Sequence, residues 1–415
     1  MQSKLHFAAL IIPLLISCSA SRHLSRTVDV TTPVFDSISP QWQTMAKVVA
    51  LNAGLPPTQG NAVEIYTDGV RQFADYNADL QGARQFVDME FFRFANDSIG
   101  HVVRDILTDK AGEGVPVRII METRANPHDP KFYGPFYTTE NISVGVVQPG
   151  SDVFGSVRNV FLRDHRKITV VDGKVAYTGG MNIRDVYYDD WRDTRLRLTG
   201  PVVGDMETLF SENWERFLKD RDTVYAWTGE KTGSLIIQAA SDGRHIKEQP
   251  VKEGFEQAIA AAEDYIYIQT PYFCPPKSTL DLLARAAERG VDVRLMLPKG
   301  QDVIFMLWTN HFFYKQLLRG GIRLYERDDP FMHSKTYVAD DYLSGYGSAN
   351  LDNRSYNLND ENMVYIFDRE TALRGKEIFM EDLRHSREIH LEDVHWNPGE
   401  TIMQWFCIGI GYKQW

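Results

Sequence analysis

The sequence predicts an α/β fold made of two similar units, each a mainly parallel mixed sheet flanked by helices, packed with pseudo-two-fold symmetry. Two observations predict this fold. A His-x-Lys motif, followed after four residues by Asp, starts at His165 and again at His333, an offset of 168 residues (333 − 165). Strand-like apolar runs alternate with helical patterns around each copy, and 415 residues are enough for two such units.

The repeat extends beyond the motif. Gly179-Gly180-Met181-Asn182 corresponds to Gly347-Ser348-Ala349-Asn350 at the same offset. Asp193 corresponds to Glu361, each 28 residues after its histidine (193 − 165 and 361 − 333). A single His-x-Lys pair is most often structural or a surface pair. Two copies with the same downstream amide and carboxylate indicate a duplicated unit that carries reactive side chains.

The amino-terminal segment is predicted to be a signal rather than part of the fold. Lys4 precedes an apolar run from Phe7 to Ile16, which is too short to span a bilayer as a mature helix. Leu15-Ile16-Ser17-Cys18 resembles a bacterial lipobox, which implies cleavage before Cys18 and lipidation of its thiol. We therefore expect a membrane-anchored bacterial lipoprotein of the cell envelope, facing the periplasm; an ordinary signal peptide or an uncleaved anchor is the alternative.

These features divide the chain into five expected parts. They are a lipoprotein-type signal peptide (1–17), a tether (18–40), a first unit (41–228), a second unit (233–395) and an aromatic tail (396–415). The tether is rich in Ser and Thr and has no periodicity.

The first unit begins with strands and helices in alternation, which indicates a largely parallel sheet. Strands are expected within residues 63–66, 83–94, 115–121, 165–171 and 195–198, and helices at 45–51, 69–80, 97–110 and 202–217. Asp97 and Ser98 can cap the third of these helices. His165 and Lys167 stand two residues apart in an extended segment, so their side chains share a face.

The second unit repeats this order. Helices are expected at 254–262, 280–289 and 304–319, and strands at 265–269, 291–297 and 322–325. Gly290 is a natural stop for the second helix. The aromatic helix 304–319 is predicted to pack in the core, with an acyl-chain groove as the less common alternative. The tail combines Trp405, Phe406 and Lys413, which suits either a membrane interface or packing on the body.

Composition narrows the function classes. The formal charge of −11 disfavours a general nucleic-acid binder, and no nucleic-acid partner is expected. The three cysteines, Cys18, Cys274 and Cys407, have no metal-ligand spacing and predict no disulfide framework, although the last two could pair in an oxidising compartment.

Each unit offers an imidazole, an ammonium, an amide and a carboxylate. A neutral histidine is a natural nucleophile or acid/base near neutral pH, so His165 and His333 are the candidate pair for a double displacement. Phosphate oxygens would be held by the repeated cations and amides, Lys167, Lys335, Asn182 and Asn350. Asp193 and Glu361 could accept a hydrogen bond from the second imidazole nitrogen. We expect no metal or other cofactor.

The motif aspartates Asp172 and Asp340 complete the candidate catalytic motifs but have a different expected role. Each follows its strand directly, before Gly173 or Asp341. Holding a turn is therefore predicted for both, rather than direct catalysis.

These residues resemble the phospholipase D superfamily, which is named for its duplicated His-Lys-Asp motif, and within it the bacterial cardiolipin synthases. The stretches that carry the resemblance to the synthases include Gly179-Gly180-Met181-Asn182-Ile183, Trp191-Arg192-Asp193-Thr194, Thr270-Pro271-Tyr272-Phe273 and Leu358-Asn359-Asp360-Glu361. The likeness covers nearly everything after the tether. Many synthases of this group begin with two membrane-spanning helices, where this chain has a lipobox, and residues 122–129 depart from the family's usual sequence.

The resemblance implies a phosphatidyl transfer at a phospholipid membrane. One histidine would attack the phosphodiester of phosphatidylglycerol and form a phosphohistidine, and a second phosphatidylglycerol would then receive the phosphatidyl group to give cardiolipin. The family's usual order implies His165 as the nucleophile and His333 as its partner. Hydrolysis of the same intermediate by water, as in a phospholipase D or a periplasmic nuclease, is the first alternative, and the acidic net charge disfavours the nuclease. A non-catalytic lipoprotein that binds anionic lipids is the second. The acceptor lipid and the oligomeric state stay open.

Overall fold

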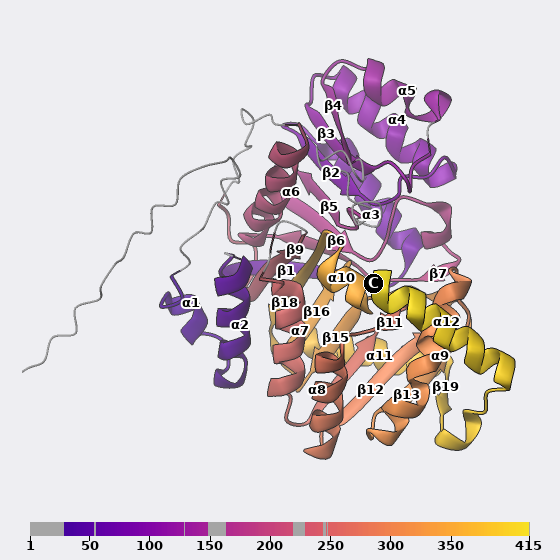
Figure 1. The fold of residues 1–415 in the computed structure, drawn as a ribbon. Helices are drawn as coiled ribbons and strands as arrows, with labels where there is room; N and C mark the ends of the chain where they lie inside the picture. The colour runs from indigo at the N-terminus through magenta and orange to yellow at the C-terminus, as the bar shows by residue number, and fades with distance from the viewer. Residues whose placement is uncertain are drawn as a thin grey trace, which may run out of the picture.

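The computed structural model describes residues 29–53, 55–127, 129–147, 163–218, 229–243, 246 and 248–414. The expected signal peptide, the lipidation site Cys18 and part of the tether lie outside these residues. The chain folds into two halves, each a sheet covered by helices, which confirms the α/β fold with a duplicated unit (Figure 1).

The first half consists of the following elements. They are α1 (Pro33–Asp36), α2 (Pro40–Ala53), β1 (Thr58–Tyr66), α3 (Gly69–Gly82), β2 (Val87–Phe91), α4 (Ser98–Gly112), β3 (Val117–Glu122), α5 (Pro130–Thr138), β4 (Ile142–Val147), β5 (Lys167–Val171), β6 (Val175–Gly179), the 3-10 turn η2 (Asp185–Tyr187), β7 (Trp191–Arg192), β8 (Arg195–Thr199) and α6 (Val202–Leu218).

The second half follows with a similar order. Its elements are β9 (Leu235–Asp242), α7 (Pro250–Ala261), β10 (Tyr265–Gln269), β11 (Phe273–Cys274), α8 (Lys277–Glu288), β12 (Asp292–Pro298), α9 (Ile304–Arg319), β13 (Arg323–Arg327), β14 (Phe331–Met332), β15 (Thr336–Ala339), β16 (Leu343–Gly347), β17 (Leu351–Asp352), α10 (Asn353–Asn357), β18 (Glu361–Phe367), α11 (Arg369–Leu383), β19 (Ser386–Ile389), the 3-10 turn η3 (Leu391–Asp393) and α12 (Pro398–Gln414).

One continuous sheet runs through both halves. Its strand order is β19-β13-β12-β10-β15-β16-β18-β9-β1-β8-β6-β5-β2-β3-β4, and the halves join where β1 pairs with β9. Helices α3 and α4 cover one face of the first half and α6 the other. In the second half, α7, α8 and α9 pack on one face and α11 on the opposite face.

The expectation of a mainly parallel sheet is wrong in detail. Among the described strands, parallel pairing within the large sheet is confined to β2-β3-β4 and β10-β12-β13, and antiparallel pairs outnumber it. The reason lies in the repeated motif. The turns at Asp172-Gly173 and at Asp340-Asp341 reverse the chain at once, so β5-β6 and β15-β16 are hairpins with no room for a crossover helix.

Helix α2 packs with the second half, although the proposed division of the chain places it in the first unit. Trp42, Met45 and Val49 of α2 are buried in the same apolar cluster as Phe255 and Ile259 of α7, which belong to the second half. Cys274 and Cys407 are buried free thiols, so the alternative disulfide between them does not form.

The tail forms the helix α12, which lies along α9 (Figure 1). The ring of Trp405 contacts that of Phe312 at a centroid distance of 5.0 Å, yet Trp405 stays 63% exposed and Phe406 61% exposed. The tail therefore packs on the body with part of its apolar surface still facing outwards.

Candidate active site

The two repeated histidines lie at the junction of the halves, each just before its strand. The backbone N–H of His165 donates to Asp360 O at 2.9 Å, and that of His333 donates to Arg192 O at 2.8 Å. Asp360 belongs to the second half and Arg192 to the first. Each histidine is thus positioned by a segment of the opposite half.

The carboxylates are exchanged in the same way. His165 Nδ1 lies 2.9 Å from Glu361 Oε2, and His333 Nδ1 lies 2.8 Å from Asp193 Oδ2. Each histidine therefore pairs with the carboxylate of the other unit, not with the one 28 residues downstream. A hydrogen bond from Nδ1–H to a carboxylate fixes the tautomer and leaves Nε2 as the nitrogen for chemistry.

Glu361 is held by donors that reasoning from the sequence missed. The Oγ atoms of Ser348 and Ser355 donate to it at 2.5 and 2.9 Å, and Asn359 Nδ2 donates at 2.9 Å. Burial alone would raise the pKa of Glu361, but its interaction with His165, the charge of Lys167 and the hydrogen bond from Ser348 hold its pKa below the ordinary value. Glu361 is therefore an ionised, fixed partner for His165.

Asp193 accepts fewer of the described hydrogen bonds than Glu361. Its Oδ1 accepts from the backbone N–H of Thr194 at 2.7 Å. Burial raises the pKa of Asp193 to about 6, against the opposing charge of Lys335. A Cβ on Gly180 would lie 2.2 Å from Asp193 Oδ1, so the carboxylate occupies the space that a side chain would need. The second unit has Ser348 there instead, and its hydroxyl bonds the longer Glu361.

The two lysines are buried beside the histidines. Lys167 Nζ donates to His165 O at 2.6 Å, and Lys335 Nζ donates to His333 O at 2.5 Å and lies 2.9 Å from His333 Nδ1. Burial lowers the pKa of Lys167 to about 7 and that of Lys335 to about 8, although Glu361 and Asp193 respectively favour the charged forms. An anion that enters the site would restore their full charge.

Both histidines are neutral in this arrangement. Burial lowers the pKa of His165 to about 4, with the Glu361 carboxylate acting in the opposite direction. Burial and then the ammonium of Lys335 place the pKa of His333 well below its usual value. A neutral imidazole has a free lone pair at Nε2 and can act as a nucleophile.

The two predicted amides lie close by but differ in their surroundings. Asn182 Nδ2 donates to the hydroxyl of Tyr187 at 2.9 Å, and its Oδ1 accepts from the backbone of Arg93. Asn350 is 4% exposed, and its Oδ1 has no hydrogen-bond partner within the described part of the chain. Asn350 and Lys335 line the same small cavity.

Asp172 and Asp340 hold turns. The carboxylate of Asp172 accepts from the backbone N–H groups of residues 84, 85 and 86. That of Asp340 accepts from the N–H groups of residues 263, 264 and 265. Their φ angles of 55° and 49° are left-handed, a conformation that Asp tolerates in turns. Among the described contacts, neither carboxylate touches the histidines or lysines.

Aromatic rings enclose the histidines, which sequence reasoning did not predict. Phe92 packs edge-on against His165 at a centroid distance of 5.0 Å. Trp191, Tyr187 and Phe331 surround His333 at 5.3, 5.7 and 6.2 Å. Trp191 and Phe331 each stand two residues before a predicted site residue, Asp193 and His333, so the period of an extended segment could have indicated this part of the wall.

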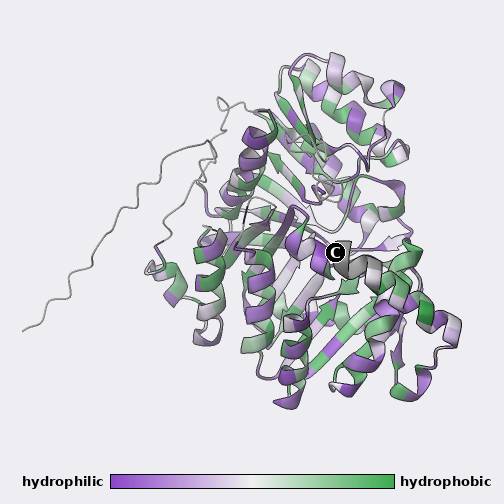
Figure 2. Ribbon diagram, in the orientation of Figure 1, coloured by the Kyte–Doolittle hydropathy of each residue, from purple (hydrophilic) through white to green (hydrophobic). Residues whose placement is uncertain are grey.

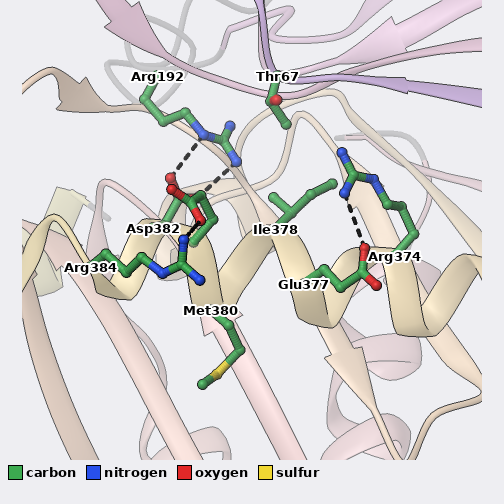
Figure 3. Close-up of a pocket in the computed structure, with 9 residues that line it drawn as sticks. Thr67, Arg192, Arg374, Glu377, Ile378, Met380, Asp382 and Arg384 are labelled. Carbon is green, nitrogen blue, oxygen red and sulfur yellow. Dashed lines mark hydrogen bonds and ion pairs between the residues drawn. The ribbon is translucent and has the colours of Figure 1, made fainter.

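Arg192 links residues of the site to helix α11. Its guanidinium donates to Asp193 O at 2.8 Å and to Ser334 Oγ at 3.0 Å, and it pairs with Asp382 of α11 (Figure 3). A cavity of about 400 Å³ lies on this side and is lined by Arg192, Thr67 and residues of α11. The histidines do not line it.

Comparisons with known proteins agree with this geometry. Residues 76–214 and 255–383 match the family model described as "Cardiolipin synthase, PLD-like domain". The chain is 32% identical to the cardiolipin synthase of Clostridium perfringens over 86% of this chain and 78% of that protein. It is also 32% identical to the cardiolipin synthase of Staphylococcus aureus, over 84% of this chain and 72% of that protein.

A solved structure shows the same fold. The phosphatidylserine synthase of Haemophilus influenzae superposes with a TM-score of 0.69 at 15% sequence identity. The superposition covers 89% of this chain and 98% of that structure.

Proposed function

This chain belongs to the cardiolipin synthase family of phospholipase D-like enzymes, and we propose that it makes cardiolipin and glycerol from two molecules of phosphatidylglycerol. The observation that carries the proposal is the pair of buried, neutral histidines, each oriented by a carboxylate of the opposite half. Such a pair provides a nucleophile and an acid/base on opposite sides of one phosphate.

The transfer takes place in two displacements. In the first, Nε2 of one neutral histidine attacks the donor phosphorus and the P–O bond to glycerol breaks. The other histidine, which takes up a proton when the anionic phosphodiester enters and raises its pKa, gives that proton to the departing oxygen. In the second, the hydroxyl of another phosphatidylglycerol gives its proton to that histidine while its oxygen attacks the phosphorus and the P–N bond breaks. Cardiolipin leaves, and both rings regain their starting protonation states.

Lys167 and Lys335 would stabilise the charge on the phosphate oxygens during both steps. Asn350 is suited to the same role, because its buried amide shares a cavity with Lys335. Asn182 would contribute its amide from the side of Tyr187. This set supplies the required positive charge and hydrogen-bond donors from side chains alone.

The protein would work at a membrane surface. Within the described residues, no helix is long and apolar enough to cross a bilayer. We propose two other attachments, acyl chains on Cys18 and an apolar face formed by α12 and the start of α9. Figure 2 shows green, hydrophobic segments along α12. The exposed side chains of this face are Val303, Ile304, Ile402, Met403, Trp405 and Phe406.

The start of α9 is connected to the site. Asp302, which precedes Val303, accepts a hydrogen bond from the hydroxyl of Tyr272 at 2.7 Å. The ring of Tyr272 lies 6.3 Å from that of His333. A lipid head group that reaches the start of α9 would therefore lie near His333.

The test uses purified protein and vesicles of phosphatidylglycerol, with and without phosphatidylethanolamine, and products identified by mass spectrometry. We expect cardiolipin and free glycerol, and we expect both to disappear in His165→Ala and in His333→Ala. Phosphatidic acid alone would make the protein a hydrolase. Turnover retained in both variants, or no product from either vesicle, would contradict the proposed enzyme.

A further inference from the structure

Three arginines gather beside His165. Arg163 and His165 flank Asp164 in an extended bridge with Asp360, so their side chains leave the backbone on the same side. Burial, and then the nearby cations of Arg354 and Arg124, lower the pKa of Arg163 to about 10. These guanidinium groups therefore lie within range of one another and of the His165 side of the site.

Arg354 is tied to the catalytic carboxylate by a short chain of contacts. Its Nε donates to Asn359 Oδ1 at 3.2 Å, and Asn359 Nδ2 donates to Glu361 Oε1 at 2.9 Å. Glu361 in turn holds His165. Arg354 is thus held on the His165 side of the site, two hydrogen bonds away from the carboxylate that orients the imidazole.

Arg124 comes from a turn that is equally fixed. Glu122 Oε2 accepts from the backbone N–H of Ala125 at 2.7 Å, and its Oε1 lies 3.9 Å from Arg163 Nε. Asn126 Nδ2 donates to Phe92 O at 2.9 Å, and Phe92 packs on His165. The turn that presents Arg124 therefore also supports the wall of the site.

We propose that Arg124, Arg163 and Arg354 bind the phosphodiester of the second lipid, the acceptor, while the lysines hold the donor phosphate. This inference rests on the proposed function. The two phosphates of cardiolipin are separated by a single glycerol, so an acceptor with its hydroxyl at the reacting phosphorus must place its own phosphate close by. A clustered guanidinium site matches a phosphodiester in charge and geometry.

This placement also assigns the two histidines. The attacking and leaving groups of a phosphoryl transfer lie roughly in line, so the acceptor hydroxyl approaches opposite the nucleophile. An acceptor bound beside His165 makes His165 the acid/base and His333 the nucleophile, the reverse of the order that the resemblance implies. The contacts agree, because the ammonium of Lys335 lies 2.9 Å from His333 Nδ1 and disfavours an imidazolium there.

The test separates the two half-reactions. Exchange of labelled glycerol into phosphatidylglycerol uses an acceptor without a phosphate, whereas cardiolipin synthesis uses an acceptor that carries one. We expect the ratio of cardiolipin formed to glycerol exchanged to fall about tenfold or more in Arg163→Gln and Arg354→Gln. Arg124 is exposed, so Arg124→Gln tests the site without disturbing the core, and Arg124→Lys should restore part of the ratio.

The matched control is Arg323→Gln, which removes an arginine of β13 that pairs with Glu388 of the edge strand β19. We expect an unchanged ratio in this variant. An unchanged ratio in all three site variants would overturn the acceptor site, and so would a parallel loss of both reactions in Arg124→Gln. Exchange that never occurs, even in the unaltered protein, would instead refute the proposed function itself.

Discussion

Asp172 and Asp340 share a motif with the reactive residues but bind backbone. Each carboxylate accepts hydrogen bonds from three successive N–H groups of a neighbouring turn. Their spacing from the histidine is conserved between the two units of this chain because each hairpin must close at the same point after its strand. The repeat alone therefore cannot distinguish a catalytic residue from one that positions the strand carrying it.

We expect Asp340→Ala to lower the free energy of unfolding by about 3 kcal/mol, because it removes charge-assisted hydrogen bonds to three N–H groups. Thermal unfolding followed by circular dichroism measures this loss, and cardiolipin formation is assayed well below the unfolding midpoint. His165→Ala is the control, with activity lost and the midpoint nearly unchanged. Asp340→Ala with a normal midpoint and no turnover would give this residue a catalytic role.

The pKa values of the two lysines predict the pH range above which activity is lost. A lysine is charged below its pKa, so Lys167, with a pKa of about 7, and Lys335, with a pKa of about 8, lose phosphate affinity as pH rises through these values. Because kcat/KM reports the free enzyme, it should begin to fall above about pH 7 and fall further above about pH 8. Lys335→Arg should move this limb to higher pH, since a guanidinium stays charged. Initial rates against pH measure the shift, and an unmoved limb would exclude Lys335 as its source.

At the scale of elements, the sequence predicted the bounds of some helices and strands to the residue. Helix α9 and strand β10 begin and end at the predicted residues, Ile304–Arg319 and Tyr265–Gln269. Strand direction was not predictable, because it depends on whether a turn or a helix follows, and the hairpin turns at Asp172 and Asp340 decide it. Helix α2 was predicted as shorter than observed and placed with the wrong core, since an apolar face does not specify its partner.

Helix α12 should contribute to membrane binding independently of lipidation. In a Cys18→Ser background, replacing Trp405 and Phe406 by Ser should weaken binding to phosphatidylglycerol vesicles about tenfold or more, because two exposed apolar side chains no longer enter the interface. Co-sedimentation measures the bound fraction. Leu51 and Tyr137 have similar exposed fractions, 62% and 61%, on other surfaces, so their replacement by Ser is the matched control. Equal effects of both pairs would exclude this face.

At the scale of the whole molecule, the two copies of the unit do not form two independent sites. The sequence predicted the two histidines, the two lysines and the two carboxylates, because they recur at one offset. It could not predict that the carboxylates are exchanged, since that depends on how the halves pack. His165 with Glu361, and His333 with Asp193, join residues of opposite halves. Neither unit alone holds a complete histidine-carboxylate pair.

The exchange of carboxylates between the halves also explains why the residues that hold these carboxylates were not predicted from the sequence. Ser348, Ser355 and Asn359 bind Glu361, and Arg192 links Asp193 to Asp382 of α11. None of these residues has a matching partner in the other unit that would have drawn attention to it. Their roles follow from packing across the junction, which a linear pattern does not record.

Covalent transfer through one histidine is the central claim, and one measurement tests it most directly. Protein is mixed with phosphatidylglycerol that carries a labelled phosphate, quenched in alkaline denaturant to preserve phosphohistidine, digested, and mapped by mass spectrometry. We expect the label on a single peptide that contains His333, and no label in His333→Ala. Cardiolipin that accumulates without any labelled histidine would contradict the covalent mechanism, and a label on His165 would reverse the roles assigned to the pair.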